Sequence, residues 1–280
     1  MTKLESLTIE FSYYNHSFPD LNFRARAILP ALTQFQFRGP QRYLEDLVAQ
    51  LGTPRLSDLT VIILIPRTQA TTHPVVQQFP QLFPFIDRAE DPKLSQFGRA
   101  CVEIHNFRSF IRFDNAQTRQ HPTCLTLGEG KYSDSWYCEE FRPFRAMGPL
   151  LGQASAVISS VHHLSITRLD RRWTSWDLSG LIRLLCSFDT VETLHVGGRF
   201  TDLFPRMLKK LSNELVADVL PALRLLNLEC KVQKFLKKKK LLVPFTEKRQ
   251  IVGRPPLTIV RTRKEFQRLQ ALTEMEGGYL

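Results

Sequence analysis

Short segments of alternating apolar residues recur along the chain. Each begins with two leucine-like residues three positions apart and continues with an apolar residue at every second position, which is the period of a strand with one buried face. The clear copies span residues 4–11, 29–37, 56–63, 161–166, 191–196 and 220–228, and weaker copies span 94–104 and 257–260. We predict that the second leucines take equivalent inward positions on successive strands: Leu7, Leu32, Leu59, Leu164, Leu194 and Leu223.

Segments with helical periodicity lie between these strands. Apolar stripes run through residues 43–51, 147–158, 178–188 and 204–219, and the last of these predicts one helix of about four turns. Pro40 and Gly52 are typical residues for the start and the end of the first helix. Because short strands and helices alternate, right-handed crossovers and a parallel sheet are expected.

The interval between successive strand patterns, 25 to 30 residues in most of the chain, is typical of leucine-rich repeats. The predicted fold is therefore an α/β, irregular leucine-rich-repeat-like solenoid of mainly parallel strands alternating with helices. A doubly wound open sheet is the alternative, but the first strands lack the glycine-rich turn or terminal acidic residue that such a sheet uses to bind nucleotides.

The middle of the chain departs from this repeat. Two strand patterns at 107–113 and 123–127 flank the polar stretch 114–122, which predicts a local antiparallel strand pair. Residues 128–131 lack the spacing of a phosphate-binding loop and are predicted to form a turn. We expect one domain over residues 1–261 and a tail over 262–280 that is helical and then disordered.

Charge is concentrated near the C-terminus. The segment 231–268 contains 13 Lys and Arg residues and two acidic ones, which accounts for the net charge of +11 of the whole chain. Such a segment is a candidate for contact with phosphates. No apolar run is long enough to span a membrane, the first residues do not resemble a signal peptide, and the five cysteines form no C-x-x-C pair. A cytoplasmic or nuclear protein with reduced thiols, and without membrane contact, is therefore expected.

Within this segment, the lysine run Lys237, Lys238, Lys239 and Lys240 covers every side of a helix, so one lysine would have to face inward. We therefore predict an exposed or frayed end. It is a candidate nuclear import signal or nonspecific phosphate contact, or a solvated tail without function.

No catalytic, metal or cofactor site is predicted. His162 and His163 begin a strand and are interpreted as structural. Arg171, Arg172, Trp173 and Trp176 form a candidate partner-binding cluster, because Trp and Arg are common at binding hot spots. The alternative is that the two indoles pack a helix against the core.

Longer stretches of sequence resemble a known family. The runs 4–14, 27–47, 83–88, 173–196 and 214–229 are similar to the C-terminal leucine-rich part of a large, expanded family of fungal F-box proteins. The resemblance implies the substrate-recognition part of a ubiquitin-ligase receptor. The F-box itself is not present before residue 4, so binding to the ligase adaptor is not expected, and residues 237–244 look like an interruption of the family's last helix.

Two functions follow as hypotheses. The first is a noncatalytic protein-interaction module that binds a protein ligand, whose identity the sequence leaves open. The alternative is nucleic-acid binding through 231–268, which we expect to be weak and nonspecific because only Phe235, Phe245 and Phe266 lie among the 13 cations.

Overall fold

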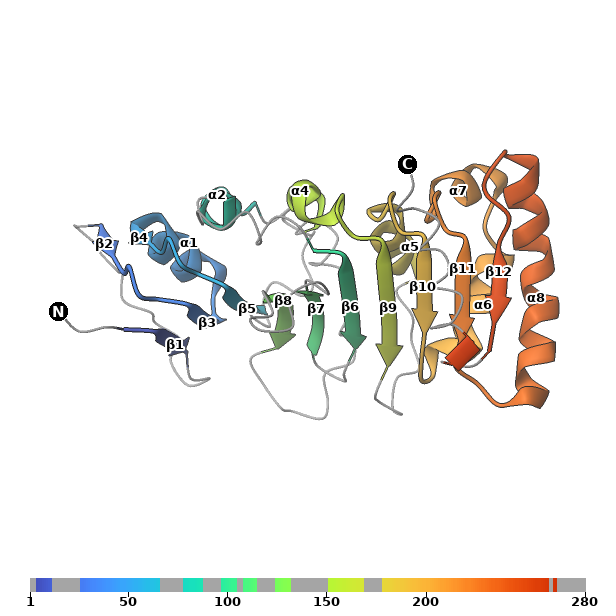
Figure 1. Ribbon diagram of the computed structural model, residues 1–280, viewed down its shortest axis with the longest axis horizontal. Helices are drawn as coiled ribbons and strands as arrows, with labels where there is room; N and C mark the ends of the chain where they lie inside the picture. The colour runs from blue at the N-terminus through green and yellow to red at the C-terminus, as the bar shows by residue number, and fades with distance from the viewer. Residues whose placement is uncertain are drawn as a thin grey trace.

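The strands of the chain assemble into one open, ten-stranded sheet (Figure 1). A computed structural model describes residues 4–11, 26–65, 78–87, 97–104, 108–114, 124–131, 151–168, 178–261 and 264–265. The strand order is β1-β3-β5-β8-β7-β6-β9-β10-β11-β12, and every neighbouring pair is parallel except the two that involve β7. The prediction of a mixed α/β fold with mainly parallel strands is confirmed.

The strands are short, as their sequence patterns predicted. Their bounds are β1 Ser6–Glu10, β3 Gln34–Gly39, β5 Asp58–Ile65, β6 Arg99–Ile104, β7 Arg108–Asp114, β8 Cys124–Lys131, β9 His163–Arg168, β10 Thr193–Val196, β11 Leu225–Leu228 and β12 Thr258–Val260. Two further strands, β2 Ala27–Ile28 and β4 Leu51–Gly52, form a small parallel pair of their own.

The predicted antiparallel pair in the middle of the chain is confirmed as β7 and β8, with Asp114 opposite Cys124. It is not a local insertion, however. Strand β8 also pairs with β5, and β6 pairs with both β7 and β9, so all three central strands complete the main sheet. The turn predicted at 128–131 is wrong, because these residues continue β8 and pair with the second half of β5.

Five of the six inward leucines are buried as predicted and Leu7 is only partly buried, and two of the six were assigned to the wrong position. Across the sheet, Leu7 pairs with Phe35, Phe35 with Leu59, Leu164 with Leu194, and Leu194 with Leu226. Leu32 and Leu223 are fully buried but precede these positions by three residues, in the turn before each strand. In both segments another apolar residue, Phe35 or Leu226, follows three positions later. Sequence spacing alone does not identify which of the two apolar residues lies in the strand.

Helices connect most of the strands. Their bounds are α1 Gln41–Gln50, α2 Leu82–Asp87, α4 Ser155–Ile158, α5 Leu178–Cys186, α6 Phe200–Lys209, α7 Asn213–Asp218 and α8 Val232–Ile251. Helices α1 and α5 match their predicted stripes, and the predicted stripe at 147–158 is described only from residue 151 on. The single helix predicted at 204–219 is wrong: Ser212 accepts a hydrogen bond from the backbone N–H of Leu215 and begins α7 as a separate helix.

Helix α8 also differs from its prediction. It runs without interruption through the lysine run and Pro244, where the sequence predicted a break near 237–244. A proline inside a helix removes one backbone hydrogen bond, at a cost of about 3 kcal/mol. Leu242 and Phe245, on either side of it, are fully buried in the core, and this packing offsets the loss. Of the predicted tail, only residues 264–265 are described.

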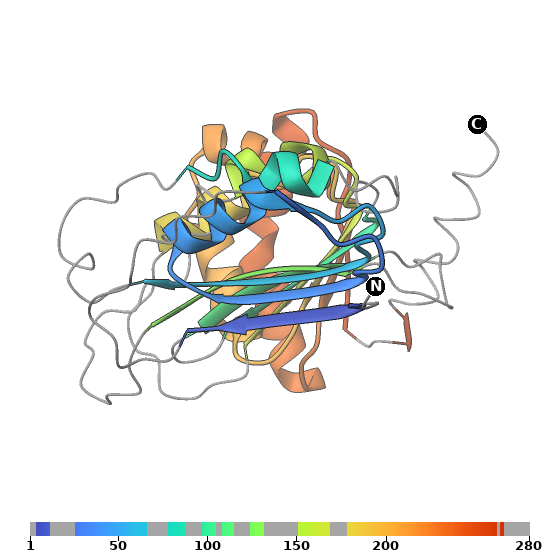
Figure 2. The ribbon, with the colours of Figure 1, turned by 90° about the vertical axis from the view of Figure 1, so that its left-hand side faces the viewer.

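The helices lie in two places relative to the sheet: over one of its faces and at its β12 end. Helices α1, α2 and α4 lie over one face of the sheet (Figure 2), against which the buried leucines and phenylalanines pack. Helix α8 lies at the β12 end of the molecule (Figure 1), where it packs on α6 and α7. Among the described residues, no helix has the length and apolar character needed to cross a bilayer.

Candidate interaction surface

A row of polar residues crosses the face of the sheet opposite the apolar core. Because side chains alternate along each strand, the residues between the buried positions point to this second face. The backbone register aligns them over nine neighbouring strands: Thr8, Gln36, Thr60, Thr126, Arg112, Cys101, Ser165, His195 and Asn227. We call these nine residues the polar row.

Charged groups gather beside the centre of the polar row. Burial raises the pKa of Asp58 and of Asp114, and in both cases the positive charge of Arg112 opposes the shift. Burial, followed by the negative charge of Glu103, raises the pKa of the Cys101 thiol to about 11. The thiol is therefore protonated at neutral pH, and it is not poised as a nucleophile.

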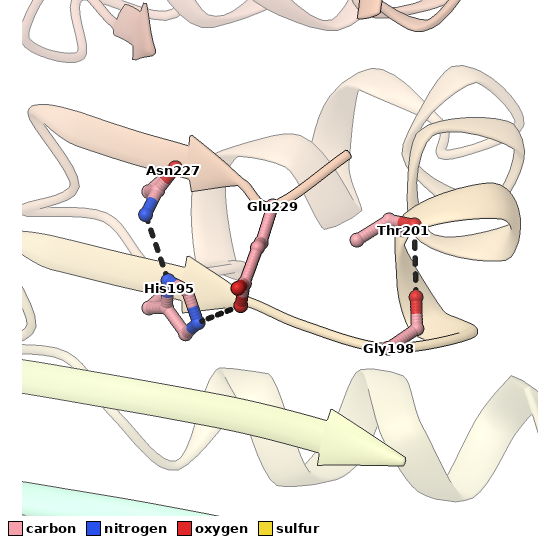
Figure 3. A network of polar contacts seen from close by, with 5 residues as sticks. All are labelled: His195, Gly198, Thr201, Asn227 and Glu229. Atoms are coloured by element: carbon pink, nitrogen blue, oxygen red, sulfur yellow. Dashed lines mark hydrogen bonds and ion pairs between the residues drawn. The ribbon is translucent and has the colours of Figure 1, made fainter. Parts of the chain in front are cut away.

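The polar row ends in a connected cluster at β10 and β11 (Figure 3). His195 Nδ1 lies 2.8 Å from the Asn227 side-chain nitrogen, and His195 Nε2 lies 3.3 Å from Glu229 Oε2. Asn227 is fully buried, and its Oδ1 has no hydrogen-bond partner within the described part of the chain. When the Asn227 amide nitrogen donates to Nδ1, the ring proton lies on Nε2 and faces Glu229 Oε2, and these contacts link the ends of two adjacent strands.

Close packing around Gly197 restricts this cluster. A Cβ atom at Gly197 would lie 3.0 Å from the Thr167 methyl carbon, 3.4 Å from His195 Nε2 and 3.6 Å from Glu229 Oε2. The contact with the Thr167 methyl carbon is tighter than an ordinary van der Waals contact, so a side chain at this position would displace that neighbour. The absence of a side chain at Gly197 therefore leaves room for the contact between the His195 imidazole and the Glu229 carboxylate.

Sequence reasoning missed the cluster of His195, Asn227 and Glu229. One signal was present, since Asn227 is a polar residue within an otherwise apolar strand. Its partner lies 32 residues away, and the parallel pairing of β10 with β11 brings the two together. The register of the sheet is not visible in a single sequence.

The site residues predicted from the sequence do not belong to the polar row. Arg171, Arg172, Trp173 and Trp176 lie outside the described residues. The lysine run lies in α8, where three lysines are exposed and Lys238 is buried. The prediction of a frayed or exposed end is wrong, because the run forms part of a continuous helix and one of its four lysines faces inward.

Lys238 faces inward because α6 provides partners for its ammonium group. Its Nζ donates a hydrogen bond to Thr201 Oγ1 at 2.9 Å and forms an ion pair with Asp202 Oδ1 at 3.0 Å. Thr201 in turn donates to the backbone oxygen of Gly198 (Figure 3). A buried ammonium is tolerated only when paired and hydrogen-bonded, and both conditions hold here.

Three more cations of the basic segment bind backbone carbonyls near the ends of α6 and α7. Arg249 donates to the carbonyl oxygens of residues 219, 220, 221 and 223, Arg254 donates to that of Ala217, and Lys248 donates to that of Leu211. Cations are favourable at helix C-termini because the last carbonyl groups lack intrahelical partners and carry partial negative charge. Four of the 13 cations that the sequence places at 231–268 therefore have partners within the fold.

In the described part of the chain, no group of three or more His, Cys, Asp or Glu side chains is arranged to hold a metal ion. His163 contacts the hydroxyl group of Thr193 on the neighbouring strand, as a structural histidine does.

No protein-family model matches the chain, and neither a curated protein nor a solved structure matches it significantly.

Proposed function

We propose that the chain is a noncatalytic protein-interaction module that binds a protein ligand along the solvent-accessible part of the polar row, which excludes Asn227. The carrying observation is the two-sided character of the sheet. One face packs the apolar core, and the other aligns polar side chains over nine strands. A polar row on a rigid sheet holds a ligand through many hydrogen bonds at fixed spacing, which suits binding better than bond chemistry.

The finer fold assignment belongs to the same proposal. We interpret the sheet as an irregular leucine-rich-repeat-like solenoid, and the repeated leucine spacing and parallel strand neighbours support this interpretation. The resemblance to fungal F-box proteins adds the proposal that the ligand is a substrate for ubiquitin-dependent degradation. This proposal is supported by the sequence similarity of five segments, which contribute strands and helices to the fold.

Nucleic-acid binding through 231–268 is the alternative function. Exposed cations favour it: Lys231, Lys234, Lys237, Lys239 and Lys240 lie on or beside α8. The internal use of Lys238, Lys248, Arg249 and Arg254 weakens it, because a cation that binds protein carbonyls or a carboxylate displaces fewer counterions from a phosphate backbone.

Site-specific photo-crosslinking tests the proposed function. Benzoylphenylalanine replaces Gln36 or Arg112, both exposed members of the polar row, and a matched control places it at exposed Glu214 on α7. Each variant is expressed in fungal cells, irradiated and analysed by mass spectrometry.

We expect the same protein to be cross-linked from Gln36 and from Arg112, and not from Glu214. Cross-linking of one protein mainly from Glu214, or of no protein from either polar-row position, would show that the polar row is not the binding surface.

A further inference from the structure

Helix α8 has a second face that its packing against α6 and α7 does not use. Four large apolar side chains on it are exposed: Val232 by 55%, Leu236 by 59%, Val243 by 44% and Ile251 by 76%. At 100° per residue they fall within an arc of about 100°, roughly opposite buried Lys238, Leu242, Phe245 and Arg249. We call these four apolar residues, together with exposed Lys237, Lys239, Lys240 and Glu247, the outer strip.

The outer strip extends along the helix at one end of the molecule. Twenty residues at 1.5 Å each make α8 about 30 Å long. Figure 1 shows α8 standing beside β12 over the full height of that end of the fold. A flat surface can therefore approach the strip without meeting the sheet.

Exposed aliphatic side chains among lysines indicate the chemistry of the occupant. Cations alone would suit any polyanion, but proteins that bind single-stranded nucleic acids add aromatic stacking to their cations. Leu236 and Val243 offer no ring to stack on a base. Aliphatic side chains flanked by lysines suit the interface of an anionic bilayer, where the apolar groups enter the acyl boundary and the ammonium groups reach the headgroups.

Two other occupants fit the strip less well. A partner helix needs an apolar seam that repeats every three to four residues. Here Lys239 and Lys240 interrupt the seam between Leu236 and Val243, and Glu247 interrupts it before Ile251. A second copy of α8 would bring the lysine run, which lies near the helix midpoint, close to its own copy and create repulsion between like charges.

We propose that the outer strip of α8 docks the protein on an anionic membrane surface, in contrast to the absence of membrane contact expected from the sequence. The helix lies in the plane of the interface with its inner face still packed on α6 and α7. This inference is independent of the polar row, which lies on the sheet, so both surfaces are available to the same molecule.

Vesicle co-sedimentation of the full chain tests the proposal. The probes are vesicles of phosphatidylcholine alone and vesicles that contain 30% phosphatidylserine. A charge variant carries K237Q, K239Q and K240Q, which leaves Lys238 and its ion pair intact, and an apolar variant carries L236S and V243S. The matched control carries R206Q, K209Q and K210Q, which remove three exposed cations near the end of α6.

We expect binding to the phosphatidylserine vesicles and little binding to phosphatidylcholine. Each lysine near an anionic surface contributes about fivefold in affinity, so the charge variant should bind roughly 100-fold more weakly. Loss of the two apolar groups should weaken binding by about tenfold. The control should stay within about threefold of the parent chain, and circular dichroism should show all variants folded.

Three results would overturn the proposal. The first is no binding to phosphatidylserine vesicles by the parent chain. The second is binding that the charge and apolar variants leave unchanged, which would place the contact elsewhere. The third is binding that is insensitive to L236S and V243S and is matched by equal affinity for a single-stranded oligothymidine, which would make the strip a general polyanion site.

Discussion

The ion pair of Lys238 with Asp202 allows a quantitative prediction, because its two partners are buried to different extents. The Lys238 side chain is 7% exposed and the Asp202 side chain is 54% exposed. At 3.0 Å and an effective dielectric constant of about 20, their attraction is about 5 kcal/mol before desolvation is subtracted. The net effect of mutating the pair depends on which partner is removed.

Replacing Asp202 by Asn should destabilise the protein by about 2 to 4 kcal/mol. The mutation replaces the carboxylate by a neutral amide, so the buried ammonium keeps neutral acceptors such as Thr201 Oγ1 and loses its negative partner, and an uncompensated buried charge is costly. Replacing Lys238 by Met should change the stability by less than about 1 kcal/mol, because an apolar chain of similar length fills the site and the exposed carboxylate regains water. The double variant should therefore recover most of the loss caused by D202N.

Urea unfolding followed by circular dichroism at 222 nm measures these differences. The control is K240M, which changes an exposed lysine of the same helix and should stay within about 0.5 kcal/mol of the parent chain. The reasoning is wrong if D202N matches K240M, or if the effects of D202N and K238M simply add in the double variant.

Four further predictions concern the core, the backbone caps and the sheet face. Leu194→Ala should cost about 2 to 5 kcal/mol in urea unfolding, because a fully buried leucine leaves a cavity. Arg249→Lys should cost about 2 to 4 kcal/mol by the same assay, since a single ammonium group cannot reach the four carbonyls that the guanidinium binds; stability equal to the parent would refute the capping role. Gly197→Ala should cost about 1 to 2 kcal/mol, and Thr167→Ser in the same chain should restore most of it by removing the methyl carbon that the new Cβ meets; no rescue would show that the strain lies elsewhere. Burial raises the pKa of Asp58, so the folded state binds the Asp58 proton more tightly than the unfolded chain does. This proton stabilises the folded state at a pH below the ordinary pKa of Asp, and the stabilisation is lost as the pH rises above the raised pKa. Asp58→Asn should therefore flatten the pH dependence of the unfolding free energy across that window, and an unchanged profile would contradict the assignment.

The sequence by itself determined the local elements. Alternating apolar residues predicted the strands of the sheet, and apolar stripes predicted α1 and α5, because both patterns depend on side chains only a few residues apart. The antiparallel pairing of β7 with β8 was also accessible, since a short polar stretch joins the two strands. The predicted partner-binding cluster at residues 171–176 lies outside the described residues and stays a prediction.

The tertiary structure decided what depends on residues far apart in the chain. The order β5-β8-β7-β6-β9 was not predictable from local pattern, because each central strand has two edges and sequence spacing does not select between them. The same holds for the cluster at His195, which the register of β10 and β11 creates. Four consecutive lysines suggested a frayed end because a single sequence does not show which acceptors will surround an inward lysine. Asp202 and Thr201, 36 and 37 residues earlier, provide those acceptors and let α8 continue as one helix.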